Sequence, residues 1–261
     1  MKTAWNRTAL FIIFTVLVST GRSDEPEQQQ PVRAPIRLPG LVVDFKKRCV
    51  DLEATVCLDK GFLELVACTK GSKEHESIVA VAARPMHIHT ALLLLNANSG
   101  NPAMRKEVGE QDKRWVDIPP RGDPIEAFFV IRNSQGKMIE RPMRDFVVRP
   151  VKQVNQTGVV ATRTRKDKPQ ATVDSFPGAF LFSGSILRDN GPGPRTYLAD
   201  LSGHVISIAT FGDALLCLPT VESNLNGTLT WRVNPKHLPE VGTKITLRLR
   251  PKNNRNTGVN K

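Results

Sequence analysis

The chain has 261 residues, with 37 Lys or Arg against 25 Asp or Glu, and its formal net charge at pH 7 is +12. This length suffices for one large domain or two small ones whose core does not depend on disulfides or a metal. The basic balance favours an anionic partner, such as an acidic polysaccharide, a lipid surface or a nucleic acid, although a solvated basic face also accounts for it. No catalytic or cofactor motif is specific enough to name a reaction.

The chain begins like a secreted protein. Two basic residues precede the apolar stretch 9–18 (ALFIIFTVLV), and small residues follow it at Ser19 and Gly21. This pattern is typical of a signal peptide cleaved after Gly21, with Ser23 as the alternative. A membrane-spanning helix would need about 20 apolar residues, so a permanent anchor is disfavoured. We therefore predict a secreted or periplasmic protein, which argues against nucleic acid as the partner.

A change of composition separates this start from the folded part. Residues 22–40 are rich in Glu, Gln and Pro, as expected of a linker. A β-rich domain is predicted over residues 41–252, with two subdomains divided near 150–170 as an alternative. Residues 253–261 form a polar tail. Basic residues concentrate in 141–168 and 244–261 without interleaved aromatic residues.

The middle of the chain predicts a hairpin, a strand and a helix in succession. Residues 53–58 and 62–69 are apolar and flank Asp59-Lys60-Gly61, which predicts a β-hairpin. The uncharged run 77–83 (SIVAVAA) predicts a strand buried on both faces. Pro85 then begins a helix over 86–95, and Asn96, Asn98 and Gly100 end it.

These residues carry a resemblance. The run KGSKEHESIVAV (70–81), a turn with Pro, and HTALLLLNANSG (89–100) resemble the YdjY domain, a bacterial family without a settled activity. The likeness continues through FLFSG (180–184), YLAD (197–200) and ALLCLP (214–219), and covers residues 42–252. Some relatives carry an iron–sulfur module. This chain has no C-x-x-C spacing, so that cofactor does not carry over, and we predict no cofactor.

The rest of the chain predicts mostly strands. The expected strands are 114–118, a hairpin of 126–132 with 137–140, an edge strand 159–164, then 179–187, 196–199, 204–211, 228–233 and 243–250. We expect residues 101–112 to be irregular and residues 213–218 to form one helical turn. The last strand alternates, with Ile245, Leu247 and Leu249 on one face. The predicted fold class is α+β, a predominantly antiparallel β-sheet with one clear helix and one short helical turn.

Four cysteines, Cys49, Cys57, Cys68 and Cys217, permit two disulfides in an oxidising compartment, in three connectivities. In the predicted hairpin, Cys57 and Cys68 fall on opposite faces of the sheet, which disfavours a bridge between them.

One cluster has groups suited to ligand binding: Glu74, His75, Glu76 and His89. On a strand, Glu74 and Glu76 would point to one face and His75 to the other. A transition metal could be held by His75 with a helical histidine, but the two-residue spacing of His87 and His89 fits such a site poorly, so no metal ligand is assigned. If a buried strand and a helix follow the cluster directly, His89 would lie far from Glu76.

The predicted function is a non-catalytic binding or interaction domain of the envelope, with an anionic polysaccharide or lipid surface as partner. One alternative is a metal-assisted hydrolase that uses His75 and His89. The other is a redox-accessory role, which only the iron–sulfur relatives imply.

Overall fold

The computed structural model describes residues 33–109, 114–149, 175–223, 225 and 228–252, all within one compact unit. Several predicted features lie outside these residues: the signal peptide with its cleavage site, residues 22–32 of the linker, the division near 150–170, the strand 159–164 and the tail 253–261.

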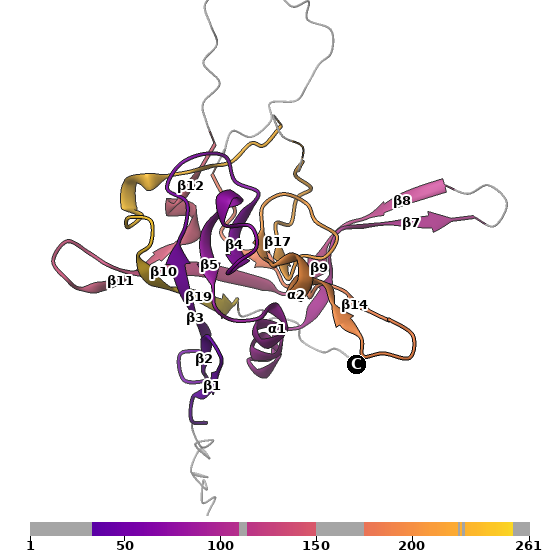
Figure 1. The fold of residues 1–261 in the computed structure, drawn as a ribbon, viewed down its shortest axis with the longest axis horizontal. Coiled ribbons are helices and arrows are strands. Elements are labelled where there is room, and N and C mark those ends of the chain that lie inside the picture. Colours follow the sequence, from indigo (N-terminus) through magenta and orange to yellow (C-terminus); the bar gives the residue numbers. More distant parts are fainter. Residues whose placement is uncertain (1–32, 110–113, 150–174, 224, 226–227, 253–261) are drawn as a thin grey trace, which may run out of the picture. The chain divides into compact units, whose positions relative to one another are not determined.

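The centre of the domain is a closed barrel of eight strands (Figure 1). In order around the barrel they are β3 (Cys49–Val56), β19 (Lys244–Pro251), β10 (Pro124–Arg132), β13 (Phe180–Leu181), β17 (Leu216–Cys217), β16 (His204–Ser207), β4 (Leu65–Thr69) and β5 (Ser77–Val81). The ring closes because β5 pairs with β3 as well as with β4.

Smaller elements surround the barrel. The strands are β1 (Ile36–Leu38), β2 (Leu41–Asp44), β6 (Ser99–Asn101), β7 (Met104–Val108), β8 (Arg114–Ile118), β9 (Arg121–Gly122), β11 (Met138–Pro142), β12 (Val147–Val148), β14 (Leu187–Arg188), β15 (Thr196–Tyr197) and β18 (Arg232–Val233). The helices are α1 (Pro85–Leu94) and α2 (Leu198–Ser202), with 3-10 turns η1 (Glu74–Glu76), η2 (Met143–Asp145) and η3 (Pro235–His237). In the described part of the chain, no helix has the length and apolar character to cross a membrane.

The β-rich α+β class is confirmed, and most barrel pairings are antiparallel as expected, but the strands form a closed mixed barrel instead of a simple sheet. Two of the barrel's eight pairings, β4 with β5 and β16 with β17, are parallel, so the barrel is mixed. Local sequence signals give strand positions and turn types. They do not give the direction in which two strands meet when other elements separate them along the chain.

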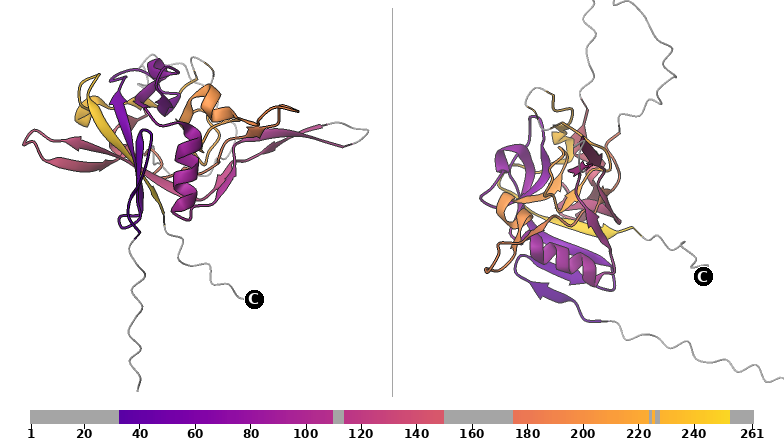
Figure 2. Two further views of the ribbon diagram at one scale, coloured as in Figure 1. Left: turned by 60° about the horizontal axis from the view of Figure 1, so that its bottom comes forward. Right: turned by 90° about the vertical axis from the view of Figure 1, so that its right-hand side faces the viewer.

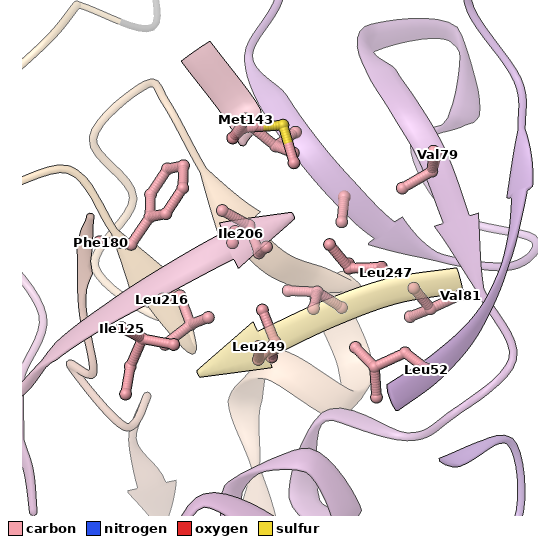
Figure 3. Close-up of a cluster of buried hydrophobic side chains, with 14 of the residues drawn as sticks. Leu52, Val79, Val81, Ile125, Met143, Phe180, Ile206, Leu216, Leu247 and Leu249 are labelled. Carbon is pink, nitrogen blue, oxygen red and sulfur yellow. The ribbon is translucent and has the colours of Figure 1, made fainter. Parts of the chain in front are cut away.

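Apolar side chains fill the barrel interior (Figure 3). Alternate residues of β10 and β19 are buried, as period-two patterning requires, and the expected inward face of Ile245, Leu247 and Leu249 is confirmed. Other labelled interior residues come from five further strands: Leu52, Val79, Val81, Phe180, Ile206 and Leu216.

The predicted buried strand and the helix after it are both present. Every residue of β5 is buried. Pro85 is the first residue of α1, and Asn96 takes a left-handed conformation with φ of 61° just beyond it. In both views of Figure 2, α1 lies close to β1, β2 and β3, and it buries Ile88, Ala91 and Leu92.

Three local predictions are wrong. The segments around Asp59-Lys60-Gly61 do not pair with each other, because β5 lies between β3 and β4 and pairs with both. Residues 213–218 contain β17 instead of a helical turn, and the short helix is α2, where a strand was expected. Part of the expected irregular stretch 101–112 is β7, which pairs with β8 in a hairpin that extends from the barrel (Figure 1).

Candidate functional site

The first part of the predicted site is a charged turn that enters β5. Glu74–Glu76 form the 3-10 turn η1, so the strand-like alternation expected for them is wrong. The hydroxyl of Ser77 donates to the carbonyl of Lys73 at 2.7 Å and closes the turn. Nζ of Lys73 lies 3.1 Å from Oε2 of Glu76 and 3.6 Å from Oε2 of Glu64.

The two carboxyl groups beside Lys73 have different pKa values. Burial, together with a hydrogen bond to Glu76 and the charge of Glu76, raises the pKa of Glu64. Burial also acts to raise the pKa of Glu76, but hydrogen bonds with Lys73 and Glu64 outweigh it, and this pKa is lowered. The same carboxylates overcome the effect of burial on Lys73 and raise its pKa. The ammonium therefore compensates the pair, as in a structural charge cluster.

His75 lies at the exposed edge of that cluster, and Glu74 contacts the loop before it. The side chain of His75 is 73% exposed, and its Nε2 lies 3.3 Å from Oε1 of Glu76. Glu74 accepts a hydrogen bond from the backbone N–H of Gly71 and lines a cavity of about 650 Å³.

That cavity lies outside the barrel, against β3, β5 and β19. Its wall includes Glu53 and Thr55 from β3, Lys244 and Thr246 from β19, and Lys70 from the loop before η1. A volume of this size lies within the range of small-molecule sites, about 300–1,000 Å³.

The charged groups of the cavity are poorly paired. Lys70, Lys244 and Glu53 are exposed, and their side chains have no hydrogen-bond or ion-pair partner among the described residues. Two free ammonium groups and two carboxylates, with Glu74 included, thus face the same space. The arrangement can hold an anionic group and accept hydrogen bonds from hydroxyl groups at once.

His89 belongs to a separate centre on α1. Its Nδ1 lies 2.8 Å from the hydroxyl of Tyr197, and that hydroxyl donates to the carbonyl of Gly184, also at 2.8 Å. The ring packs edge-on against Phe182, with centroids 4.8 Å apart. Because the phenol has one proton and gives it to Gly184, it accepts from His89, and the lone pair of the imidazole is on Nε2.

Burial sets the ionisation of this centre. It lowers the pKa of His89, partly offset by a hydrogen bond with the backbone of Gly184, and so favours the neutral imidazole. It also raises the pKa of Tyr197, with the charge of Asp200 as a second cause.

The blocks that carry the family resemblance converge here. His89 comes from HTALLLLNANSG, Gly184 from FLFSG and Tyr197 from YLAD. Asp200 of the same block accepts a hydrogen bond from the backbone N–H of Met86 and pairs with Arg84, which fixes the start of α1.

The predicted site residues therefore occupy two places. Glu74, His75 and Glu76 precede β5 and His89 follows it, and five extended residues span about 16 Å. Glu74 reaches the cavity, whereas His89 contacts Tyr197 and Phe182. Across the described ranges, no three His, Cys, Asp or Glu side chains are placed to hold one metal ion.

Sequence reasoning missed the partners that complete both places. Tyr197 is 108 residues from His89, and Lys244 reaches the cavity from the last strand. The order of the family blocks along the sequence was a signal for the contact between His89 and Tyr197. No local signal exists for the position of Lys244 at the cavity, because that position depends on closure of the barrel.

The four cysteines are free thiols. Cys57, just after β3, and Cys68 on β4 both lie beside β5, so the hairpin geometry used to disfavour their pairing does not apply. Burial raises the pKa of Cys57 to about 12 and that of Cys49 to about 11, so both are protonated at neutral pH.

Comparison with known proteins bears on this arrangement. A sequence profile of the YdjY domain matches residues 41–250, which include both places described above. No curated protein and no solved structure matches the chain. Since the profile covers most of the sequence, this protein belongs to the YdjY domain family.

Proposed function

We propose that this is a secreted or periplasmic, non-catalytic binding domain whose ligand is an acidic sugar unit of an envelope polysaccharide. The observation that carries the proposal is the 650 Å³ cavity with Lys70 and Lys244 beside Glu53 and Glu74. The amino-terminal pattern of the chain supports an extracytoplasmic location.

The charges of the cavity favour a sugar acid over a simple anion. Lys70 and Lys244 supply ammonium donors for a carboxylate. Glu53 and Glu74 would repel a bare anion, but they accept hydrogen bonds from sugar hydroxyl groups. A uronic acid presents one carboxylate among several hydroxyl groups, and so matches both kinds of group.

The chemistry of the two predicted histidines agrees with binding better than with hydrolysis. His75 is exposed and contacts a neighbouring carboxylate, and His89 is held by Tyr197 on the other side of β5. They do not meet at a common point, as the hydrolase alternative requires.

The test is calorimetric titration of the purified protein with oligomers of galacturonic acid at low salt. We expect binding that weakens as salt rises, because the lysines are exposed and their attraction is screened. A neutral glucose oligomer of equal length should not bind.

Matched variants separate the cavity from general charge. Lys70→Gln with Lys244→Gln should weaken binding at least tenfold, whereas Lys46→Gln with Lys60→Gln, exposed lysines outside the cavity, should leave it unchanged. Equal losses of affinity in the two double variants would show that binding depends on diffuse charge. Binding to anionic vesicles without binding to the oligomers would show that the ligand is a lipid.

A further inference from the structure

A buried histidine–carboxylate pair lies at the start of β16, apart from the cavity charges and from His89. His204 is 6% exposed, and its Nδ1 lies 2.7 Å from Oδ1 of Asp213. Its ring stacks on Phe211, with centroids 4.2 Å apart. Because a carboxylate only accepts, Nδ1 carries the proton and the lone pair of His204 is on Nε2.

Asp213 is suited to hold that tautomer. Its Oδ1 lies 2.7 Å from Nδ1 of His204 and accepts the hydrogen bond of that nitrogen. This bond orients the imidazole.

The other ring nitrogen lacks a partner. Nε2 of His204 is buried, and no group in the described part of the protein forms a hydrogen bond with it. Buried polar atoms in native proteins are usually hydrogen-bonded, so this nitrogen calls for an explanation. The lone pair is thus available to a ligand.

A thiol lies directly across from it. Cys68 on β4 is the register partner of His204 on β16, and the register shifts immediately after this pair. Opposed residues of antiparallel strands bring their side chains close together. Cys68 is fully buried and reduced. Cys57 packs against the same small cluster, which contains Leu65, Cys68 and Ala80. Cys57 also lines the 650 Å³ cavity, so it connects the cluster to an entry from solvent.

We propose that Sγ of Cys68 and Nε2 of His204 bind one Cu(I) ion, that Asp213 orients the imidazole, and that Cys57 is the sulfur an entering ion meets first. A histidine whose other ring nitrogen is held by a carboxylate is the usual arrangement at protein metal sites. Thiolate ligands select Cu(I), and this ion accepts two donors in a linear geometry, so the lack of a three-donor group is no obstacle. On binding, the Cys68 thiol gives its proton to solvent and the ion keeps its oxidation state. The site is independent of the proposed sugar ligand.

The test is anaerobic titration of the reduced protein with Cu(I) in competition with the chromophoric chelator bicinchoninate. We expect one ion per chain, with sulfur and nitrogen neighbours in the X-ray absorption spectrum of the complex. Less than a tenth of an ion per chain, or a spectrum with sulfur neighbours alone, would overturn the proposal.

Variants identify the ligands. Cys68→Ser should abolish stoichiometric binding, and Asp213→Asn should weaken it about 10- to 100-fold, as for other carboxylates that orient a metal-bound histidine. Cys217→Ser removes a buried thiol outside the cluster and should bind like the parent. Undiminished binding by folded Cys68→Ser would refute the assignment. If that variant does not fold, the unaltered protein is treated with an alkylating reagent with and without Cu(I), and modification of Cys68 is mapped by mass spectrometry. Protection of Cys68 by Cu(I) supports the site, and unchanged alkylation contradicts it.

Discussion

Arg248 and Asp51 are joined by two hydrogen bonds of 2.7 Å, from Nε and from one terminal nitrogen of the guanidinium to the two carboxylate oxygens. They are register partners on β19 and β3, and 197 residues separate them along the chain. The second terminal nitrogen of Arg248 donates to Glu140 on β11, also at 2.7 Å. One side chain thus connects three strands on the outer face of the barrel.

Replacement of Arg248 by Met should destabilise the protein by about 2 kcal/mol, because Asp51 and Glu140 lose charged hydrogen bonds and stay partly buried. Urea unfolding measures the loss. Arg188→Met is the control, since Arg188 is exposed on β14 and should change stability by less than about 0.5 kcal/mol. Equal effects of the two substitutions would show that the network contributes nothing.

The same network predicts a loss of stability in acid. Burial acts to raise the pKa of Glu140, but its bonds with Arg250 and Arg248 outweigh burial and lower it. A carboxyl group whose folded pKa is below the unfolded value stabilises the protein above about pH 4.5, and this contribution disappears as the pH falls through the folded value. Between pH 6 and pH 3, the urea midpoint should therefore fall less in Glu140→Gln than in the parent protein. An identical fall would contradict the assignment.

Gly122 should not tolerate a side chain. Its φ is 144°, and an added Cβ would lie 2.0 Å from the carbonyl oxygen of Phe182, a backbone atom that cannot move aside. Gly122→Ala should cost about 3 kcal/mol or more. Gly191→Ala also has a positive φ, 72°, but meets no atom within 4 Å and should cost about 1 kcal/mol. Thermal unfolding compares the two, and similar melting temperatures would contradict the close approach.

Tyr197 offers a direct spectroscopic test, because it is the single tyrosine of the chain. Burial raises its pKa above the usual value of about 10. The phenolate absorbance near 295 nm should therefore stay absent from the folded protein at pH 10 to 11 and appear near pH 10 in denaturant. Ionisation at pH 10 with the fold intact would show that Tyr197 is not buried.

The thiols give a further prediction. Ellman's reagent should detect four thiols in denaturant and react slowly with the folded protein at pH 7.5, since burial raises the pKa of Cys57 to about 12 and of Cys49 to about 11. Fewer than four thiols in denaturant would show that the protein holds a disulfide.

The parts of the fold that local signals determine were predictable from the sequence. Pro85 and Asn96 mark the two ends of α1, and the absence of charge in 77–81 indicates the buried strand β5. The alternation of β19 likewise predicts which face is buried. In each case the signal and the structure lie within a few residues of each other.

The errors come from contacts that no local signal contains. The segments around Gly61 have the composition of a hairpin, but both pair with β5, which is made later in the chain. The predicted site residues lie in two separate places for the same reason. The sequence places His75 and His89 fourteen positions apart, whereas β5 separates them in space and Tyr197 and Lys244 arrive from distant strands.

The position of β19 has a consequence for how the protein is made. This strand is the last of the domain, yet it lies between β3 and β10, near the middle of the sheet order. A nascent chain that has emerged only as far as residue 240 can form neither of these pairings, so its barrel has two open strand edges that expose apolar residues. Closure of the barrel must then wait until β19 has been synthesised. Until that strand arrives, the edges of β3 and β10 remain open to pairing with other strands.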